Sequence, residues 1–336
     1  MTTTRVLPTA TLGTVEVGRQ GLGCMGMSAF YGPSDLAESR ATLERALELG
    51  VTLFDTADMY GSGHNEEFVG EFVRAHRDQV VLATKFAIEL RADDPSYRGV
   101  NNSPDYIRRA VDASLTRLGI DVIDLYYMHR RDPQVPIEDS VGTMAELVAQ
   151  GKVRQLGLSE VTGDELRAAH AVHPIAAVQS EWSLFSRDVE RTAVPAAAEL
   201  GVTFVPYSPL GRGFLTGAFA SGEQLSDSDF RRTMPRFSGA NAEHNAELLA
   251  PLRAIARARG ISPAQVALAW VQGRAAADGL SVVPIPGTRS RTRLEENVAA
   301  ATIELSAEEL ATLEPIAAQV AGPRYADMSF TSAGRE

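Results

Sequence analysis

The segment VVLATK, residues 80–85, is a run of apolar and β-branched residues that ends in a lysine. A nearly continuous apolar run of this length is typical of a parallel strand that is covered on both faces. Runs of the same kind, bounded by turn residues, recur along the chain. They are VTLFD at 51–55, VIDLYYMH at 122–129, VRQLGLS at 153–159, AAVQS at 176–180, TFVPYS at 203–208 and SVVPIPG at 281–287. With a further strand near Gln20–Cys24, the sequence predicts eight strands.

Helix signals lie between these strands, as serine N-caps, prolines in the first turn and glycines after the last turn. They predict helices over residues 34–50, 103–119 and 188–201 and a helix that begins at Ser262. Strands that alternate with helices predict an α/β fold, the (β/α)₈ or TIM barrel, which reaches this length as one domain, here residues 1–336. An open sheet of seven or eight strands is the alternative.

Two segments fall outside this alternation. Arg5–Pro8 and Val15–Val17, on either side of a turn at Gly13, predict an N-terminal β-hairpin. Residues 221–245 are rich in Gly, Ser, Asp, Asn and Arg and predict a long loop. We interpret this loop as a lid over a bound ligand, because long loops in compact domains often serve function.

The composition restricts the classes of function. The chain has 336 residues and a formal net charge of −11, so we expect no nucleic-acid partner. Cys24 is the one cysteine, which excludes an intrachain disulfide, and histidines without an HExxH pattern predict no metal site. Because the sequence has neither about 18 consecutive apolar residues nor the apolar core of a secretory signal, we expect no membrane span and a cytoplasmic location. The oligomeric state stays open.

Gly21, Gly23 and Gly26 form a GxGxxG pattern, which by itself resembles the phosphate-binding loop of a Rossmann fold. That loop must open directly into a helix. Here the pair Gly32-Pro33 interrupts the chain before the next helix begins. The context therefore argues against a Rossmann domain.

Polar residues stand at or just beyond the ends of the predicted strands. They are Asp55, Lys85, His129, Ser159, Gln179, Tyr207-Ser208 and Gly287-Thr288-Arg289. In a barrel the carboxyl ends of the strands converge, and (β/α)₈ enzymes build their sites on that face. The sequence thus predicts one pocket made of residues that are far apart in the chain.

Asp55, Tyr60, Lys85 and His129 together suit the reduction of a carbonyl group. Such a reduction needs a general acid, and a tyrosine with an ordinary pKa of about 10 ionises too reluctantly near neutral pH. We expect Lys85 to lower the pKa of Tyr60, and Asp55 to keep Lys85 charged. His129 can hydrogen-bond the substrate oxygen and orient the carbonyl. Taken singly, each residue has an ordinary structural explanation, so the hypothesis depends on their meeting in one pocket.

The order of these motifs resembles that of the aldo-keto reductase superfamily, whose catalytic tetrad is Asp, Tyr, Lys and His. FDTADMYGSGHNEEFVG supplies Asp55 and Tyr60 five residues apart, TKF supplies Lys85, and DLYYMHRRDP supplies His129. VRQLGLSE, VQSEWSLF, VPYSPLGRGFLTG and IPGTRSRTRLEENV look like the family's cofactor-binding strand ends. The resemblance extends over residues 22–297 and implies an NADPH-dependent enzyme that reduces small-molecule aldehydes or ketones.

The resemblance also implies how the cofactor binds. Ser159 and Gln179 would hold the nicotinamide carboxamide, and Tyr207 would stack on the nicotinamide ring. The implied contacts with the rest of the cofactor are Ser208, Leu210, Gly211 and Gly213 along the pyrophosphate, Gly287, Thr288, Arg289 and Arg293 at the 2′-phosphate, and Glu296 and Asn297 at the adenine. Arginine forks beside a helix start suit a phosphate dianion.

Three positions depart from the family pattern. Glu160 stands where many members have Asn, which leaves its contact with the carboxamide open, and Ala218 stands where a lysine follows LTG. Trp182 replaces a frequent Tyr. With Phe30 and Tyr31 it is expected to form an apolar wall of the substrate pocket, and packing at the barrel rim is the alternative.

Two other classes of function compete with a reductase. Some chains that resemble this family serve as regulatory β subunits of potassium channels, which bind nucleotide and turn over slowly. The other class is a phosphate-handling barrel isomerase with Lys85 and His129 as acid and base. Turnover of an aldehyde would exclude the first class, and binding of a nicotinamide cofactor would argue against the second.

Overall fold

Seven parallel strands form the central sheet of the protein in a computed structural model that describes residues 7–28, 30–32, 34–89 and 99–336. From one edge to the other, the strands are β3 (Leu22–Gly23), β4 (Leu53–Asp55), β5 (Val81–Phe86), β8 (Ile123–Met128), β9 (Val153–Ser159), β10 (Ile175–Glu181) and β11 (Thr203–Tyr207). The order of these strands in the sheet is therefore the same as their order along the chain. A short antiparallel pair, β6 (Ile88–Glu89) and β7 (Gly99–Val100), follows β5.

Residues 281–287 lie between the two edge strands, β11 and β3. The two ends of this segment form isolated parallel bridges to those strands, and the N–H of Ile285 donates to Pro206 O of β11 at 3.0 Å. Pro284 and Pro286 have no N–H, so the segment cannot form a regular ladder. The predicted eighth strand is therefore irregular, but it closes the sheet, and the prediction of a (β/α)₈ barrel is confirmed.

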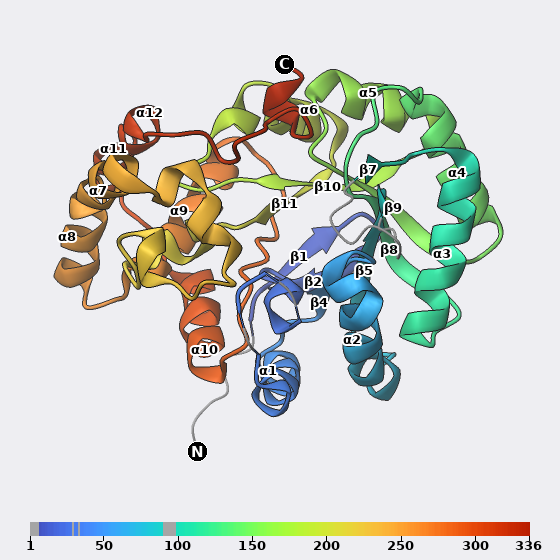
Figure 1. Ribbon diagram of the computed structural model, residues 1–336, viewed down its shortest axis with the longest axis horizontal. Helices are drawn as coiled ribbons and strands as arrows, with labels where there is room; N and C mark the ends of the chain where they lie inside the picture. The colour runs from blue at the N-terminus through green and yellow to red at the C-terminus, as the bar shows by residue number, and fades with distance from the viewer. Residues whose placement is uncertain (1–6, 29, 33, 90–98) are drawn as a thin grey trace.

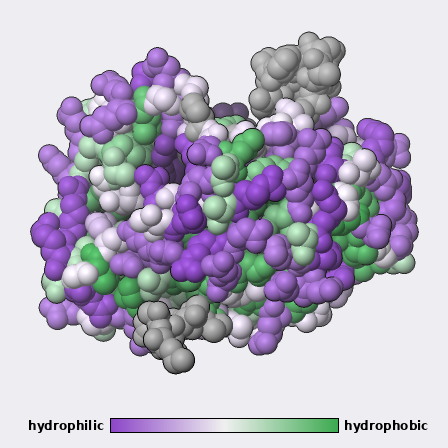
Figure 2. Space-filling view, turned by 90° about the horizontal axis from the view of Figure 1, so that it is seen from below, coloured by the Kyte–Doolittle hydropathy of each residue, from purple (hydrophilic) through white to green (hydrophobic). Residues whose placement is uncertain are grey.

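Helices surround the sheet (Figure 1). They are α1 (Leu36–Glu48), α2 (His64–Ala75), α3 (Pro104–Leu118), α4 (Ile137–Ala149), α5 (Gly163–Val172), α6 (Ala193–Leu200), α7 (Gly239–Glu247), α8 (Ala250–Arg259), α9 (Pro263–Ala277), α10 (Arg291–Ala299), α11 (Ala307–Leu313) and α12 (Ile316–Gln319). None of the described helices is both long and apolar enough to cross a bilayer. The face seen in Figure 2 is mostly hydrophilic, with apolar residues only in small groups.

The predicted helix limits agree with α1, α3 and α9 to within two residues, whereas residues 188–190 form a separate 3-10 turn before α6. Ser262 caps α9 in a reciprocal arrangement with Gln265, as its sequence signal indicates. The cap of α1 is not Ser34. Asp35 fills that position, because its carboxylate accepts hydrogen bonds from the N–H groups of Ala37 at 2.8 Å and Glu38 at 3.2 Å.

The N-terminal hairpin consists of β1 (Thr9–Leu12) and β2 (Val15–Gly18), which pair around a two-residue turn at Gly13. The predicted hairpin and its turn at Gly13 are confirmed, but Leu7 and Pro8 are not part of its first strand, because the tight turn pairs Leu12 directly with Val15. Arg5 and Val6, the rest of the predicted strand, lie outside the described residues. Leu12 and Val17 are buried among the residues that fill the barrel interior. The hairpin thus covers one end of the barrel.

Residues 221–245 are more ordered in secondary structure than predicted. They contain 3-10 turns at 222–224, 230–233 and 235–237, and α7 begins at Gly239. Helix α7 therefore begins inside the segment that was predicted to be a loop. The buried amide of Asn245 donates to Arg236 O at 3.0 Å and connects α7 with the turn before it. The prediction of one long loop is therefore wrong beyond Gly239. Its role as a lid stays a prediction.

The C-terminal segment, residues 320–336, returns to the carboxyl ends of the strands and binds Glu160, the residue after β9. Arg324 forms a bidentate pair with the Glu160 carboxylate, at 2.9 and 3.2 Å, and both side chains are buried. The Ser332 N–H and the Tyr207 hydroxyl donate to the same carboxylate, at 3.1 and 2.7 Å. Burial alone would raise the pKa of Glu160, but the charges of Arg324 and Arg130 and these hydrogen bonds lower it to about 2.

The buried pair predicts a clear cost when one partner is removed. Arg324→Met should lower the free energy of unfolding by about 3–5 kcal/mol, because it removes the direct cationic partner of the buried Glu160 carboxylate. Chemical denaturation at pH 7 measures this loss. The double variant Glu160→Gln/Arg324→Met should lose less, and Arg191→Met, which breaks the exposed Arg191–Glu336 pair, should lose little. If the loss in the double variant equalled the sum of the losses in Arg324→Met and Glu160→Gln, the two side chains would not be coupled and the pairing would be contradicted.

Candidate active site

Three of the four predicted catalytic residues lie at the carboxyl ends of neighbouring strands. Asp55 ends β4, Lys85 lies in β5, and His129 follows β8 directly. Lys85 Nζ donates to Asp55 Oδ1 and, at 2.7 Å, to the carbonyl oxygen of Thr56. Both members of this ion pair are buried. The pairing of β4 with β5 therefore sets a buried cation and a buried anion side by side at the mouth of the barrel.

Tyr60 reaches the same place from the loop after β4. The chain turns back there through Gly61 and Ser62, whose φ values are +58° and +55°. Lys85 Nζ lies 5.3 Å from the centroid of the Tyr60 ring. The ring centroids of Tyr60 and His129 are 5.9 Å apart, with the rings almost perpendicular. The structure thus brings all four predicted side chains together.

Burial controls the charge of these groups. It raises the pKa of Tyr60 well above the usual range, and the negative charge of Asp55 raises that pKa further. Burial also lowers the pKa of His129 well below its usual value. It lowers the pKa of Lys85 as well, but the negative charge of Asp55 acts against this lowering. Arg130 is the cation that opposes the rise at Tyr60, and the expectation that Lys85 lowers the pKa of Tyr60 stays a prediction. Tyr60 and His129 are both neutral.

The surroundings of Tyr60 differ in part from the expected apolar wall. Phe30 packs edge-on against Tyr60, with the ring centroids 6.4 Å apart. Trp182 does not join this wall: it is fully buried, packs on Phe204, and donates from Nε1 to Glu190 at 2.9 Å. This places the indole in the core under the helix layer, because Phe204 belongs to the same core cluster. The alternative of structural packing is therefore the right one for Trp182.

The residues expected at the nicotinamide lie beside the tetrad. Gln179 Nε2 donates to Asp55 Oδ2 at 2.8 Å, so the ends of β4 and β10 are joined across the barrel. Ser159 Oγ accepts a hydrogen bond from Arg130. Tyr207 is held through its hydroxyl by Glu160. Glu160 itself has its carboxylate turned to Arg324 and Tyr207, which explains why it departs from the Asn of the family pattern.

The segment after β11 turns tightly through residues with left-handed backbone. Ser208, Gly211, Arg212 and Gly213 all have positive φ values, of +48°, +54°, +58° and +91°. The N–H of Gly211 donates to Ser208 O at 2.9 Å, and that of Gly213 donates to Leu210 O at 3.0 Å. Contact of this segment with the pyrophosphate of a dinucleotide stays a prediction.

The residues expected at the adenosine end follow the irregular strand. Gly287, Thr288 and Arg289 precede α10, whose nine residues include Arg293, Glu296 and Asn297. In this structure the Arg289 guanidinium donates to the carbonyl oxygens of Gly26, Tyr31 and Gly32, at 2.9–3.2 Å. Arg293 is exposed and Asn297 is buried. Through these hydrogen bonds Arg289 holds Gly26, Tyr31 and Gly32 next to the candidate adenosine site.

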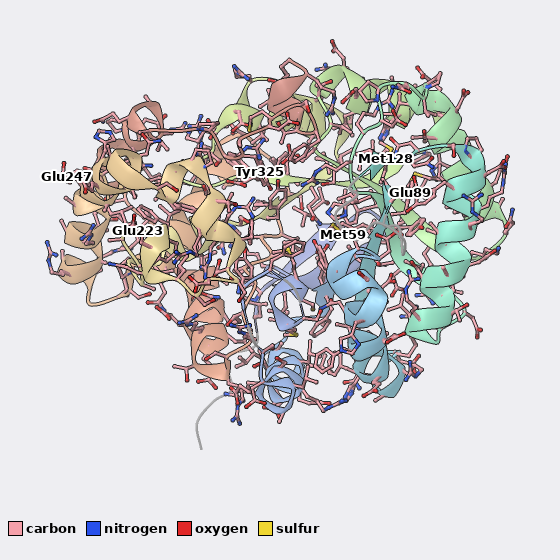
Figure 3. All side chains as sticks on the ribbon, viewed as in Figure 1. Met59, Glu89, Met128, Glu223, Glu247 and Tyr325 are labelled. Atoms are coloured by element: carbon pink, nitrogen blue, oxygen red, sulfur yellow. The ribbon has the colours of Figure 1, made fainter. Side chains whose placement is uncertain are left out.

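Four residues of the site were not singled out from the sequence: Arg130, Arg212, Tyr325 and Phe330. Arg212 is buried, pairs with Glu181 at 2.9 Å and donates to the Tyr325 hydroxyl. Tyr325, labelled in Figure 3, lies on the C-terminal segment, and the Phe330 ring centroid lies 6.0 Å from the Arg130 guanidinium. Arg130 directly follows His129 and could have been noticed there. The two aromatic residues carry no sequence signal, because only the fold of the tail brings them to the barrel mouth.

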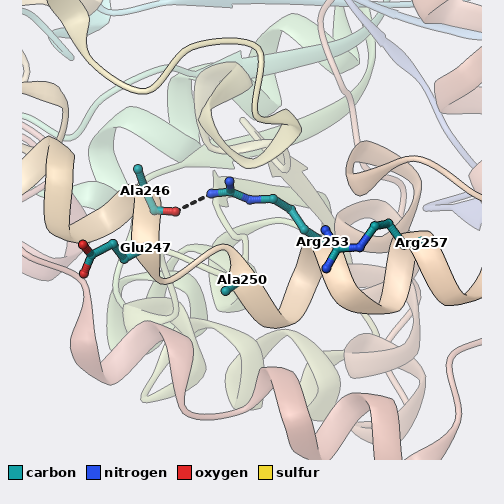
Figure 4. Close-up of a pocket in the computed structure, with 5 residues that line it drawn as sticks. All are labelled: Ala246, Glu247, Ala250, Arg253 and Arg257. Atoms are coloured by element: carbon teal, nitrogen blue, oxygen red, sulfur yellow. Dashed lines mark hydrogen bonds between the residues drawn. The ribbon is translucent and has the colours of Figure 1, made fainter.

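A groove on the outer surface is separate from these residues. It lies along α7 and α8 and is lined by Ala246, Glu247, Ala250, Arg253 and Arg257 (Figure 4). None of the predicted site residues lines it.

Comparison with known proteins agrees with this geometry. A model of the aldo/keto reductase family matches residues 19–318. A protein of Schizosaccharomyces pombe named aldo-keto reductase yakc, with NADP(+) in its name, is 43% identical over 326 residues, which are 95% of this chain and 94% of that protein.

Two solved structures are similar over almost the whole chain. The structure of a glycerol dehydrogenase from Gluconobacter oxydans matches with a TM-score of 0.80 and 26% identity, over 97% of this chain and 99% of that one. An aldo/keto reductase from Klebsiella pneumoniae, solved in complex with NADP and acetate, matches with a TM-score of 0.72 and 29% identity, over 96% and 98% of the two chains. The chain belongs to the aldo/keto reductase family.

Proposed function

We propose that this protein is an NADPH-dependent reductase that converts aldehydes or ketones into alcohols, with Tyr60 as the proton donor. The observation that carries the proposal is the meeting of the Asp55–Lys85 ion pair, Tyr60 and His129 at one end of the barrel. Its relative in Schizosaccharomyces pombe has NADP(+) in its name, and one similar solved structure contains NADP. The cofactor supplies a hydride when it is bound.

The described residues suggest how the chain would hold NADPH. Ser159, Gln179 and Tyr207 lie beside the tetrad and would receive the nicotinamide. The turns formed by Ser208, Leu210, Gly211 and Gly213 would receive the pyrophosphate, and Gly287, Thr288, Arg289, Arg293, Glu296 and Asn297 would surround the 2′-phosphate and the adenine.

The charge states of the tetrad suit proton donation to a carbonyl oxygen. Because the pKa of Tyr60 is high, its hydroxyl stays protonated and can give its proton as negative charge grows on the substrate oxygen. The neutral His129 can orient that oxygen by a hydrogen bond, and its Nδ1 has no hydrogen-bond partner in the part of the chain that the structure describes. Arg130, whose charge lowers the pKa of Tyr60, and Lys85, whose Nζ lies 5.3 Å from the ring centroid, would stabilise the resulting phenolate.

The substitution Tyr60→Phe tests the proton donor. It keeps the ring, and with it the packing against Phe30, so NADPH affinity should change little. If the hydroxyl delivers the proton, the rate of hydride transfer should fall by roughly 10²–10⁴. Single-turnover oxidation of NADPH by a reactive aldehyde measures this rate, and fluorescence titration measures the affinity.

A variant that binds NADPH and keeps the wild-type rate would refute the assignment. A wild-type protein that binds NADPH without turnover would indicate a regulatory module instead.

The substitution Arg289→Ala tests the 2′-phosphate site. If Arg289 turns to this phosphate, the variant should bind NADPH about 1.5–3 kcal/mol less tightly and NADH almost as well as the wild type. Arg291→Ala is the matched control, since Arg291 is a surface arginine two residues away that pairs with Glu38. Equal losses for NADPH and NADH would mean that Arg289 only fastens the loop at 26–32.

A further inference from the structure

Arg130 is a buried arginine of the candidate site, just after the carboxyl end of β8. It follows His129 in the chain and is 8% exposed. One of its terminal nitrogens, Nη1, donates to His129 O at 2.7 Å and to Ser159 Oγ at 3.3 Å. The guanidinium therefore lies between the residue proposed to orient the substrate and a residue proposed to hold the nicotinamide.

Arg130 differs from the other buried cations of the described residues in having no carboxylate within 4 Å. The others each have one: Lys85 has Asp55, Arg131 has Glu165 at 3.6 Å, Arg212 has Glu181 at 2.9 Å, and Arg324 has Glu160 at 2.9 Å. A buried cation without an anion is costly, so its presence beside reacting groups indicates a ligand-binding role.

The surrounding described groups give Arg130 no direct ion pair, although the charge of Glu160 acts on it from a distance. The Glu160 carboxylate is occupied by Arg324, Tyr207 and Ser332, which use its acceptor positions. The rings of Tyr207 and Phe330 lie 6.0 Å from the guanidinium carbon, a distance at which the cation–π attraction is only partial compensation. Within the described residues, no carboxylate is left to pair directly with Arg130, so this position is open to an anionic group of a bound molecule.

We propose that Arg130 binds a carboxylate of the substrate, and that the protein reduces carbonyl compounds that carry an acidic group, such as oxo acids and semialdehydes. This inference rests on the proposed reductase function. The phosphates of NADPH belong at the loop after β11 and near Arg289, whereas the nicotinamide end carries an uncharged amide. A carboxylate fits the arginine fork, and the position of Arg130 next to His129 would hold it close to the reacting carbonyl.

The experiment compares 4-carboxybenzaldehyde with its methyl ester, which differ in charge but present the same aldehyde. In the wild type, kcat/KM should favour the acid. Arg130→Met should reduce the ratio of kcat/KM for acid over ester by about 10- to 100-fold, the range for losing hydrogen bonds to a charged group. Arg130→Lys should lose part of this ratio, because a lysine keeps the charge but not the fork. Benzoate should inhibit the wild type more strongly than Arg130→Met.

Arg131→Met is the matched control, because Arg131 is the next residue, is also buried, and has Glu165 as its partner. It should leave the ratio between acid and ester unchanged. Equal losses for acid and ester in Arg130→Met would overturn the inference and assign Arg130 to the cofactor or to the electrostatics of Tyr60. A wild type that reduces the ester but shows no preference for the acid would also overturn it. A wild type that reduces neither aldehyde would instead refute the proposed reductase function.

Discussion

The ion pair between Lys85 and Asp55 is the interaction around which the site is arranged. Burying two opposite charges costs free energy unless each has further hydrogen bonds. Here Asp55 accepts from Gln179 of β10, and Lys85 donates to the carbonyl oxygen of Thr56. These contacts join β4, β5 and β10, so the pair is stable only in a closed barrel. The closure by residues 281–287 and the chemistry at the strand ends therefore depend on each other.

Burial around this pair makes the remaining groups neutral. Tyr60 and His129 both lie where water is excluded, and their pKa values move in opposite directions for the same reason, since burial disfavours the charged form of each. A neutral phenol and a neutral imidazole can hydrogen-bond an uncharged carbonyl without first losing or gaining a proton. The positive charges of Lys85 and Arg130 then matter at the moment when the phenol loses its proton.

The sequence predicts the features that depend on local patterns. Near-continuous apolar runs locate the strands, and polar residues at their ends locate the pocket, because closure of a barrel brings those ends together. What it could not predict depends on contacts between distant segments. Trp182 turns to Glu190 and Phe204 in the core, and Glu160 meets Arg324, 164 positions further along the chain. The first hairpin strand, Thr9–Leu12, was also missed, because it is defined by its pairing with Val15–Gly18 and not by an apolar run of its own.

Glu160 shows how a single departure from a family pattern changes the surroundings of a site. A carboxylate buried at this position needs cations, and Arg324 supplies one by drawing the C-terminal segment over the strand ends. The same segment brings Tyr325 to Arg212 and Phe330 to Arg130. Because Arg324 takes the direct contacts with Glu160, Arg130 feels that charge only from a distance and pairs directly with no carboxylate of the described residues. The tail therefore does more than cover the barrel: by saturating the one carboxylate near Arg130, it leaves that cation available to an anionic group of a bound molecule.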